Sequence, residues 1–455
     1  MTMDYKLHTI SGDTTTPIAL FNNLTGQKVL FESSAKHEES GRYSFIAAAP
    51  LYTVIGEDTT TRVQHRDGSV TEYAQHSIDY IKNLLPKLEG DYPFPFFGGA
   101  IGYIGYETIF TYEAIGNKLP ATHALPDTHL LIFDNFIVFD HREETITFVA
   151  VALEERTETQ LQASIDLLMT QALTTQPLPH ITEPLTFTPA MAPAQFKQLV
   201  TEAKQAIVAG EVFQVVLSQK FTADFTGDAF SLYRKLRTAN PSPYMFYLAF
   251  GDYTVLGTSP ESLVKVTGDT VITNPIAGTR PRGKTAREDE ALARELLADD
   301  KELAEHKMLI DLSRNDVGKI ANIGTVEVSR YAQIEKYQHV MHIVSEVRGQ
   351  LLPHLHALDA LMACLPAGTV SGAPKVRAMQ LINELESERR GVYAGAVGYL
   401  SVTGAMDFAL AIRTMVIEGG TASVQAGAGI VYDSDAQKEY EETLHKAKAL
   451  LEVIQ

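Results

Sequence analysis

Short apolar runs dominate the first 175 residues, and they predict strands. The clearest are Tyr43–Ala47, His129–Asp140 and Thr145–Ala152. Further along, apolar residues recur at helical spacing over Ala194–Ala209, and Gly210 is a natural stop. The apolar face of this predicted helix consists of Phe196, Leu199, Val200, Ala203 and Ile207. A strand-like run, Val212–Phe221, follows the helix.

A proline-rich stretch divides this pattern into two parts. Its prolines are Pro177, Pro179, Pro184, Pro189 and Pro193. Proline is excluded from helix interiors and from central strands. We therefore expect a linker over residues 176–193, between an N-terminal part (residues 1–175) and a C-terminal part (residues 194–455).

A weak internal repeat relates the two parts. The run Gly99–Tyr103 resembles Gly395–Tyr399, and strand-like segments follow both. Glycine inside a strand often marks the close approach of another backbone. Two sheets packed closely face to face would explain these glycines.

Composition is typical of an ordinary globular protein, with 45% hydrophobic and 21% charged residues. The 455 residues correspond to about three domain equivalents. Residues 1–17 lack the pattern of a secretory signal, and no run of about 18 apolar residues predicts a membrane span. The single cysteine, Cys364, excludes an internal disulfide and suits a reducing cytosol, so we expect a cytoplasmic protein.

The formal net charge of −18 argues against a nucleic-acid surface, and an anionic substrate would need local cations or a metal ion. Two pairs of glutamates, each with a spacing of three, could supply a metal site: Glu302 with Glu305, and Glu439 with Glu442. The first pair lies among strong helix formers, Ala286–Leu312, and Ser434 with Gln437 has capping-box spacing before the second pair. Such pairs share one helix face, and carboxylate oxygens are suitable ligands for Mg²⁺. The alternative is a solvated acidic face on which Glu442 pairs with Lys446.

Other polar residues stand in apolar or glycine-rich surroundings. His342 lies in the run Val340–Ser345, where a histidine is either a proton-transfer group or a satisfied core residue. Arg413 stands alone in a strand-like segment, and its planar fork suits a substrate carboxylate or a structural ion pair. The segment Leu365–Lys375 is glycine-rich and opens a helix at Pro374, whose free amides would attract an anion.

Several segments resemble motifs of the chorismate-using enzymes. They are Glu211–Ser218, Gly257–Glu261, Asn274–Arg280, Lys301–His306, Asp311–Asp316, Val340–Ser345, Leu365–Lys375 and Ser434–Lys446. In that superfamily a lysine at the Ala277 position marks the aminodeoxychorismate synthases. A lysine at the Gln214 position marks the isochorismate and salicylate synthases. This chain has neither lysine and resembles the large, aminating subunit of the anthranilate synthases.

The resemblance implies an α+β fold: two large, mostly antiparallel sheets packed face to face, with helices on the outside. It implies Mg²⁺ as cofactor, held by Glu302, Glu305, Glu439 and Glu442. It places Glu261 as the acid that helps the ring hydroxyl of chorismate depart, His342 as the proton-transfer group of the elimination step, and Gln214 in the slot beside the attacked carbon. The implied contacts to chorismate are Ala277, Gly278, Thr279, Thr369, Tyr393, Arg413, Gly427, Ala428, Gly429 and Lys446.

The two missing lysines indicate the nucleophile. Gln214 cannot act as a base that activates water, and Ala277 cannot attack the ring covalently as a lysine could. Ammonia needs neither kind of help, and its addition at ring carbon 2 followed by loss of pyruvate gives anthranilate. Cys364 lacks the setting of a glutaminase nucleophile, so we expect a separate glutaminase subunit to supply the ammonia.

Two further segments resemble a tryptophan-binding regulatory site. Leu30–Ser33 resembles the family's Leu-Leu-Glu-Ser, and Asn240–Phe246 resembles its partner segment. The implied tryptophan contacts are Ser33, Pro243, Tyr244 and Met245. Phe31 departs from the usual leucine, and aminodeoxychorismate synthases keep a similar pocket. On this interpretation residues 1–175 carry regulatory elements, and residues 194–455 carry the chorismate-binding catalytic part.

The alternatives are an aminodeoxychorismate synthase, an isochorismate or salicylate synthase, and a non-catalytic amino-acid sensor on the same fold. Ala277 argues against the first and Gln214 against the second. The intact set of four glutamates with His342 and Arg413 argues against the sensor, because a decayed enzyme would have little reason to keep clustered like charges, which are unfavourable without a cation.

Overall fold

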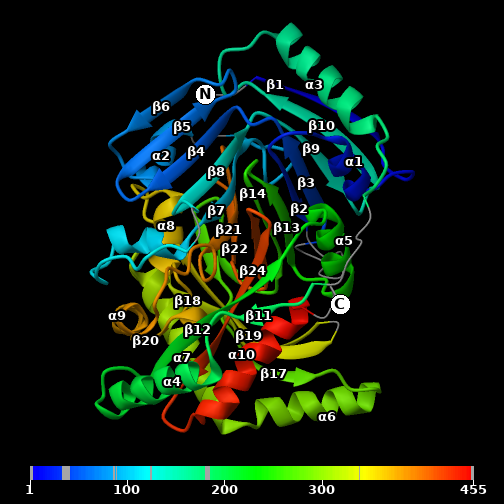
Figure 1. The fold of residues 1–455 in the computed structure, drawn as a ribbon. Coiled ribbons are helices and arrows are strands. Elements are labelled where there is room, and N and C mark those ends of the chain that lie inside the picture. The colour runs from blue at the N-terminus through cyan, green and yellow to red at the C-terminus, as the bar shows by residue number, and fades with distance from the viewer. Residues whose placement is uncertain are drawn as a thin grey trace.

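The computed structural model describes residues 4–32, 41–85, 88, 90–122, 125–179, 185–337 and 339–451. It confirms the expected α+β architecture, with two large antiparallel sheets packed against each other and helices outside them (Figure 1). No helix in these described ranges is both long enough and apolar enough to cross a membrane.

The first sheet contains eleven strands in one continuous path and a twelfth, β20, beside β12. In order across the sheet they are β1 (Tyr5–Ser11), β10 (Thr145–Val151), β9 (Asn135–Asp140), β3 (Tyr43–Ala48), β2 (Lys28–Glu32), β13 (Tyr244–Ala249), β14 (Tyr253–Ser259), β23 (Thr414–Glu418), β24 (Thr421–Ile430), β12 (Gln214–Asp224) and β11 (Thr188–Pro189), with β20 at Gly372–Ala373.

The second sheet has the same number of strands, with β18 (Glu327–Lys336) beside β19. Its continuous path is β17 (Ile276–Pro281), β19 (Val340–Gln350), β16 (Thr270–Thr273), β15 (Ser262–Thr267), β22 (Met406–Leu410), β21 (Ala396–Ser401), β7 (Gly99–Ile104), β8 (Thr128–Phe133), β4 (Tyr52–Glu57), β5 (Thr60–His65) and β6 (Val70–Tyr73). Both sheets join strands from the two sides of the proline-rich segment, because β2 pairs with β13 and β7 pairs with β21. Residues 1–175 and 194–455 therefore share their cores.

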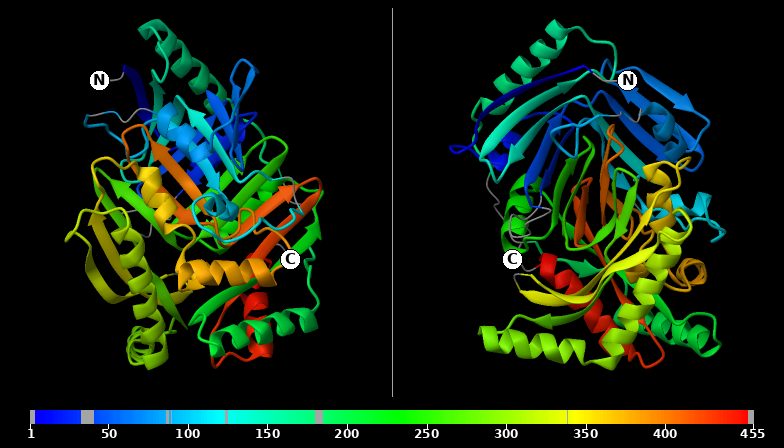
Figure 2. Two further views of the ribbon diagram at one scale, coloured as in Figure 1. Left: turned by 90° about the vertical axis from the view of Figure 1, so that its left-hand side faces the viewer. Right: turned by 180° about the vertical axis from the view of Figure 1, so that it is seen from behind.

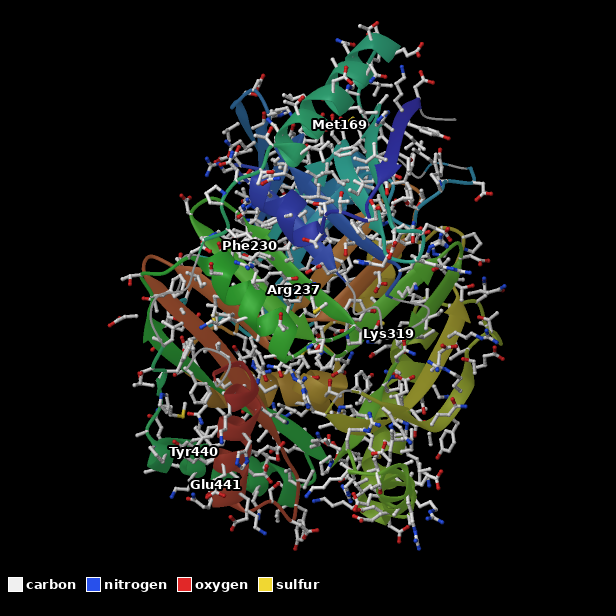
Figure 3. The ribbon with its side chains drawn as sticks, turned by 90° about the vertical axis from the view of Figure 1, so that its right-hand side faces the viewer. Met169, Phe230, Arg237, Lys319, Tyr440 and Glu441 are labelled. Atoms are coloured by element: carbon white, nitrogen blue, oxygen red, sulfur yellow. The ribbon has the colours of Figure 1, made fainter. Side chains whose placement is uncertain are left out.

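Apolar clusters fill the space between the sheets and the space under the helices. The cluster between the sheets includes Phe31, Phe133, Phe246 and Tyr399. Outside the first sheet, a cluster lies under α1 (Pro17–Asn23), α3 (Glu158–Leu173) and α5 (Ala229–Ala239), and Figure 3 shows Phe230 and Arg237 on α5. Outside the second sheet, the cover consists of α2 (Ser77–Leu84), the 3₁₀ helix η1 (Tyr106–Thr111) and α8 (Ala357–Cys364).

Five more helices surround the end of the molecule that carries most of the candidate site (Figures 1 and 2). The helices packed on β12 and β24 are α4 (Pro193–Val208), α9 (Lys375–Leu385) and α10 (Ala436–Leu451). Those on β17 and β19 are α6 (Ala286–Leu297) and α7 (Asp300–Gly318), and a second 3₁₀ helix, η2, spans Gly368–Val370. The helix predicted at Ala194–Ala209 is confirmed as α4, with Phe196, Val200 and Ala203 buried.

The run His129–Asp140 is not one strand, although its continuous apolar pattern predicts one. It forms β8 in the second sheet and β9 in the first, because the chain crosses between the sheets at Asp134. This buried carboxylate accepts hydrogen bonds from Arg66 at 2.5 Å and from Arg156 at 3.1 Å. Two ion pairs therefore hold the crossing, and the polar residues Asp134 and Asn135 were its sign in the sequence.

The expected helix over Ala286–Leu312 is also divided. It forms α6 and α7, and Asp299 stands between them. The Asp299 carboxylate accepts from the amides of Lys301 and Glu302 at 3.1 and 3.2 Å, which starts a new helix. At α10 the capping residue is Asp435 and not Ser434, because Asp435 Oδ1 accepts from the amides of residues 437 and 438.

The glycine repeat has a different cause from the one expected. The two glycine-containing runs are β7 and β21, which are neighbours within one sheet, and Gly102 lies directly opposite Gly398. A Cβ on Gly102 would lie 2.1 Å from the carbonyl oxygen of His129 in the adjacent strand. The close approach that requires glycine is therefore between strands of one sheet and not between the two sheets.

A buried ion pair completes one edge of β12 between β20 and β11. The Ser218 amide donates to Glu386 Oε1 at 2.9 Å, and the Val216 carbonyl accepts from Arg390 Nη2 at 2.8 Å. Arg390 also donates to the Val370 carbonyl at 2.6 Å and pairs with Glu386 at 2.6 Å. The two charged side chains are only 1% and 6% exposed. They occupy the place of a neighbouring strand and link β12 to η2.

Replacing Arg390 by methionine would leave the Glu386 carboxylate buried without its counter-charge. We expect Arg390→Met to lower the free energy of unfolding by about 3–5 kcal/mol, measured by urea denaturation at pH 7. Arg377→Met is the matched control, because Arg377 pairs with Glu211 and Glu384 near the surface. That control should lose at most about 1 kcal/mol. Equal losses in the two variants would contradict the structural role of Arg390.

Candidate active site

Two helices bring the four predicted metal-binding glutamates near one another. Glu302 and Glu305 lie on α7, and Glu439 and Glu442 lie on α10. Burial raises the pKa of Glu305, and the like charges of Glu302 and Glu442 raise it further. Glu442 on α10 therefore lies within electrostatic reach of Glu305 on α7. Arg280 approaches Glu302 at 3.3 Å and Lys446 approaches Glu442 at 2.7 Å, which offsets part of the negative charge.

The donor chemistry of this cluster fits a hard divalent cation. Carboxylate oxygens are the protein ligands that Mg²⁺ prefers, and like charges held together are unfavourable unless a cation compensates them. Within the described ranges, however, no three or more His, Cys, Asp or Glu side chains are close enough to form a ready-made coordination group. The four glutamates provide suitable donors near one another, and two of them are paired with Arg280 and Lys446.

Glu261 has the environment of a carboxylic acid that titrates near neutral pH. It lies between β14 and β15, and Thr369 Oγ1 donates to Glu261 Oε1 at 2.8 Å. Burial raises the pKa of Glu261 to about 7, against the lowering effects of the Thr369 hydrogen bond, Lys446 and Arg413. A general acid is most effective when its pKa lies near the working pH.

His342 lies on β19 in one defined tautomer. Its Nδ1 is 2.8 Å from the Gly278 carbonyl oxygen, which can only accept, so Nδ1 carries the proton and Nε2 keeps its lone pair. Thr279 Oγ1 is also 3.2 Å from Nδ1. Burial lowers the pKa of His342, opposed by its hydrogen bond to Gly278, so the neutral imidazole is favoured as a base. The predicted contacts Gly278 and Thr279 thus orient the predicted base.

Gly278 itself occupies a position that requires glycine. Its φ is +65°, at a register shift between β17 and β19. A Cβ there would lie 2.9 Å from Leu296 and 3.1 Å from Glu302 Oε2. The glycine therefore lets β17 approach α7 closely enough to place His342 and the first glutamate pair in one site. The adjacent Ala277 is buried.

Arg413 differs from its prediction in two respects. It lies in the bend between β22 and β23 and not within a strand, and its φ is +48°. Its guanidinium makes no hydrogen bond or ion pair with any of the residues that the structure describes, so the structural ion pair is not formed. Burial lowers the pKa of Arg413, although nearby Glu261 and Tyr337 favour the charged form. A part-buried guanidinium without a partner is suited to a ligand carboxylate.

The glycine-rich end of β24 lies under two polar side chains. A Cβ on Gly427 would lie 2.7 Å from the Tyr393 hydroxyl, and one on Gly429 would lie 2.8 Å from Gln214 Nε2. Lys446 Nζ donates to the Gly427 carbonyl at 3.1 Å. Ala428 points to the opposite face, into the cluster under α4 and α10. The side chain of Ala428 therefore cannot face this site, and only its backbone can make the predicted contact.

Comparisons with known proteins place these residues in a family. Residues 26–452 match the model of the chorismate binding enzymes. The chain belongs to the chorismate-binding enzyme family. It is 45% identical to anthranilate synthase component 1 of Lactococcus lactis subsp. lactis, over 98% of this chain and 99% of that protein. It is 42% identical to anthranilate synthase component 1 of Acetivibrio thermocellus, over 100% of this chain and 97% of that protein.

A solved structure agrees with this assignment, and a more distant one shares the fold. The crystal structure of anthranilate synthase component I from Streptococcus pneumoniae has a TM-score of 0.85 and 44% identity, covering 97% of this chain and 98% of that one. The menaquinone-specific isochorismate synthase of Escherichia coli shares the fold, with a TM-score of 0.74 at 21% identity, covering 100% of this chain and 95% of that one. The resemblance to component I of anthranilate synthase that the motifs indicate is thereby confirmed.

In this chorismate-binding enzyme the two segments of the expected tryptophan site are neighbours. β2 pairs with β13, and Glu32 lies opposite Met245. Ser33 lies outside the described residues. The Tyr244 side chain lies between the sheets, whereas the Met245 side chain lies under α1 and α5, so a ligand between the sheets could reach only the backbone of Met245. Pro243 directly precedes β13 and is partly exposed.

Side chains without a predicted role also shape the site. The Tyr337 ring lies edge-on to His342, with ring centroids 5.4 Å apart, and Glu386 with Arg390 holds the strand that begins at Gln214. The i, i+4 spacing of Glu386 and Arg390 is typical of an ion pair on a helix surface. These two residues follow the end of α9, however, and their ion pair is buried.

A pocket beside Glu261 is lined in part by Thr273, Ser313, Asp316 and Thr369.

The raised pKa of Glu261 predicts a pH-dependent stability. The folded protein binds this proton more tightly than the unfolded chain, because the pKa rises from 4.5 to about 7 on folding. The associated stability is complete below about pH 4.5 and is lost as the pH rises through about 7. Glu261→Gln cannot bind this proton, so its stability lacks this dependence on pH. The free energy of unfolding of the variant minus that of the wild type should therefore be roughly 3 kcal/mol larger at pH 8 than at pH 4.5. Urea denaturation at both pH values measures this change, and a difference that does not vary with pH would contradict it.

Proposed function

We propose that this chain converts chorismate and ammonia to anthranilate and pyruvate, as the large subunit of an anthranilate synthase that uses Mg²⁺. The observation that carries the proposal is the combination of an acid, a base and a carboxylate receptor. Glu261 has a pKa of about 7, His342 presents a free Nε2, and Arg413 has an unpaired guanidinium within the described structure. The full-length similarity to proteins named anthranilate synthase component 1 supports the same reaction.

The proposed first step is a substitution across the ring. Ammonia forms a bond to ring carbon 2, the ring double bonds shift, and the bond from carbon 4 to its hydroxyl breaks. Glu261 Oε gives its proton to the departing hydroxyl, which leaves as water, and the new ammonium group loses a proton. Thr369 holds the Glu261 carboxyl in place at 2.8 Å. A pKa near 7 keeps much of this carboxyl protonated at neutral pH.

The proposed second step is an elimination. His342 Nε2 removes the proton from carbon 2, the bond from carbon 3 to the enolpyruvyl oxygen breaks, and pyruvate leaves while the ring becomes aromatic. The Gly278 carbonyl holds the opposite nitrogen, Nδ1, so the lone pair of Nε2 is available. The sum of the two steps is chorismate plus ammonia giving anthranilate, pyruvate and water.

Glu302, Glu305, Glu439 and Glu442 would hold the Mg²⁺ ion. When bound, the ion would supply positive charge to the ring carboxylate of chorismate and stabilise negative charge during the reaction. Arg413, Tyr393 and the backbone of Gly427–Gly429 would hold the second carboxylate. Gln214 cannot activate water and Ala277 cannot attack the ring, so ammonia would be the nucleophile of the substitution.

The ammonia would come from a glutaminase partner. Cys364 is the chain's single cysteine, it is buried, and burial raises the pKa of its thiol to about 12, so it is not suited to act as a nucleophile. The relatives are named component 1, which is consistent with a second component. Tryptophan would act as a feedback inhibitor between the sheets near Tyr244, with Phe31 edge-on to that ring at 6.4 Å.

The reaction can be tested on the purified chain. Incubation with chorismate, Mg²⁺ and an ammonium salt at alkaline pH should yield equal amounts of anthranilate and pyruvate, measured by fluorescence and mass spectrometry. A chelator should abolish both products, and Glu305→Gln should lower the rate by roughly a hundredfold or more, because even the loss of a residue that only orients a metal ligand costs about 10–100-fold. Glu290→Gln on the exposed side of α6 is the control and should keep the rate. Aminodeoxychorismate or isochorismate as the product would refute the assignment of the nucleophile, and binding of tryptophan without any turnover would favour the sensor.

Tryptophan inhibition has its own test. The Tyr244 hydroxyl donates to Asp407 Oδ1 at 2.9 Å, which fixes the ring between the two sheets. Tyr244→Phe removes this bond, so the tryptophan concentration for half-inhibition of ammonium-dependent activity should rise roughly tenfold, with the uninhibited rate nearly unchanged. Tyr247→Phe is the matched control, since Tyr247 lies on the same strand but under α1 and α5. The same shift in both variants would exclude a site at Tyr244.

A further inference from the structure

A buried ion pair that has no role in the reaction proposed above joins α7 to the start of α9. Lys375 Nζ donates to Asp316 Oδ2 at 2.5 Å, and each of the two side chains is only 8% exposed. The same Nζ donates to the Cys364 carbonyl at 3.1 Å, at the last residue of α8. One ammonium group therefore links three helices, and it connects the two ends of the glycine-rich segment, residues 364–375.

This segment contains the hydroxyl that holds the candidate acid. Thr369 lies in the middle of η2, and its Oγ1 donates to Glu261 Oε1 at 2.8 Å. Among the residues that the structure describes, this is the only hydrogen bond to the Glu261 side chain. The orientation of the acid therefore depends on where η2 lies.

One face of α7 supports η2 and also carries the first pair of candidate metal ligands. Residues spaced by three and four form one row on a helix. This row consists of Glu302, Glu305, Leu309, Leu312 and Asp316. A Cβ on Gly368 would lie 2.6 Å from Leu312 and 3.3 Å from Leu309, so η2 rests directly on the row. At about 1.5 Å per residue the row extends for about 21 Å, from the glutamates past η2 to the ion pair.

The acid and the ion pair also line one pocket between α7 and the segment. Its lining includes Glu261, Thr369, Leu312 and Asp316, and its empty space, including the opening, is about 390 Å³. Empty space provides no contacts that would hold its walls in place. In the described part of the chain, the bond from Lys375 to Asp316 is the only hydrogen bond between α7 and the segment.

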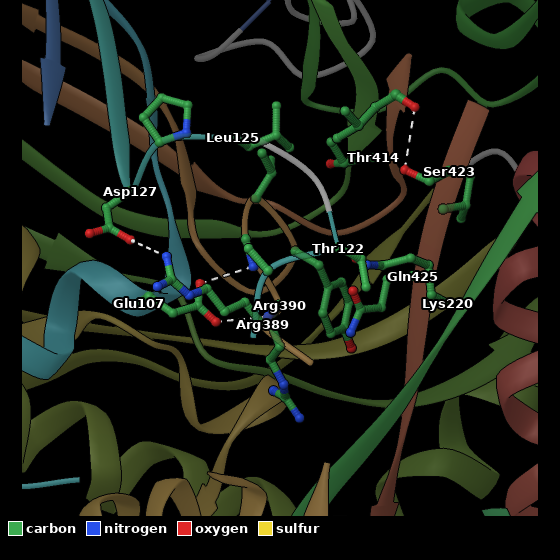
Figure 4. A pocket seen from close by; sticks show the side chains of 17 residues that line it. Glu107, Thr122, Leu125, Asp127, Lys220, Arg389, Arg390, Thr414, Ser423 and Gln425 are labelled. Atoms are coloured by element: carbon green, nitrogen blue, oxygen red, sulfur yellow. Dashed lines mark hydrogen bonds and ion pairs between the residues drawn. The ribbon is translucent and has the colours of Figure 1, made fainter. Parts of the chain in front are cut away.

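The opposite side of the segment is held separately. Arg390 donates to the Val370 carbonyl at 2.6 Å, and the backbone amide of Arg390 donates to Glu107 at 2.7 Å. Both Arg390 and Glu107 line the pocket in Figure 4, to which Tyr393 also contributes. These contacts fix the segment to the first sheet and leave its position on α7 to Lys375.

We propose that Lys375 is a positioning residue that fixes η2 to α7 and so holds the Thr369 hydroxyl against Glu261. The inference rests on the proposed function, in which Glu261 gives its proton to the departing ring hydroxyl. A misplacement of about 1 Å in such an arrangement can cost on the order of a hundredfold in rate. Lys375 acts through Thr369 and does not touch the substrate.

A double-mutant cycle tests whether Lys375 acts through Thr369. The rate of ammonium-dependent anthranilate synthesis at saturating chorismate is measured for Lys375→Met, for Thr369→Val and for the double variant. Lys375→Met should lower the rate roughly tenfold or more in the wild-type background. In the Thr369→Val background it should lower the rate less than about threefold, because the hydrogen bond that Lys375 supports is already absent. Equal losses in the two backgrounds would overturn the proposal.

A second variant separates positioning from stability. Asp316→Asn combined with Lys375→Met removes both charges with little change in size, so no uncompensated charge is buried. Its midpoint of urea denaturation should stay close to that of the wild type, whereas its rate should remain roughly tenfold or more below wild type. Recovery of the wild-type rate would show that the pair serves stability alone. Lys82→Met is the matched control and should keep the rate within about twofold, since Lys82 pairs with Asp359 at 2.5 Å away from the site.

The pH profile gives a readout that lost stability would not move. The hydrogen bond from Thr369 lowers the pKa of Glu261, as do Lys446 and Arg413, which both variants keep. In Lys375→Met, as in Thr369→Val, the pKa of Glu261 should therefore rise. The loss of rate at alkaline pH, measured at a fixed concentration of uncharged ammonia, should then move to higher pH. An unchanged alkaline limb would contradict the role of Lys375, whereas a wild type that makes no anthranilate from ammonium would refute the proposed function instead.

Discussion

The buried ion pair between Arg390 and Glu386 is the interaction on which the candidate site depends most. It replaces a missing strand at the edge of β12, where it satisfies the Ser218 amide and the Val216 carbonyl. It also donates to the Val370 carbonyl, next to the threonine that holds Glu261. A buried charge pair requires complete hydrogen bonding, and this requirement fixes its neighbours in turn. The Arg390 guanidinium further lies 5.0 Å from the centroid of the Tyr106 ring and 5.6 Å from that of the Tyr393 ring.

Burial assigns different protonation states to the groups of the site. It raises the pKa of Glu261 to about 7, where a carboxyl can donate a proton, and it lowers the pKa of His342, where an imidazole can accept one. The two shifts have opposite directions because desolvation disfavours whichever form is charged. An acid and a base can therefore work at the same pH within one site. Arg413 keeps its guanidinium without a protein partner in the described structure, although Glu261 lies within its electrostatic reach.

The negative net charge of the chain is compatible with an anionic substrate because charge is arranged locally. Arg280 and Lys446 each pair with one of the four glutamates on α7 and α10. Arg413, in the bend between β22 and β23, lies near Glu261 and Tyr337. A divalent cation among the glutamates would add to these positive groups. In the pocket behind Tyr393, by contrast, Lys220 and Arg389 are already paired with Glu388 and Glu57.

The sequence by itself determined the fold class, the family and the helix α4, because periodic apolar faces and contiguous motifs are local properties of a chain. It also predicted site roles for the glutamates, His342, Glu261 and Arg413, since each stands within a short recognisable run. It did not separate β8 from β9 or α6 from α7, because a single aspartate decides each break through its tertiary or capping contacts.

Only the tertiary structure decided that the Gly278 carbonyl sets the tautomer of His342 and that Arg413 lacks a protein partner within the described structure. It alone brought Glu386 and Arg390 to the edge of β12 and placed Tyr393 in the lining of a pocket. These properties depend on contacts between residues far apart in the chain, and the burial that shifts a pKa exists only once both sheets have packed.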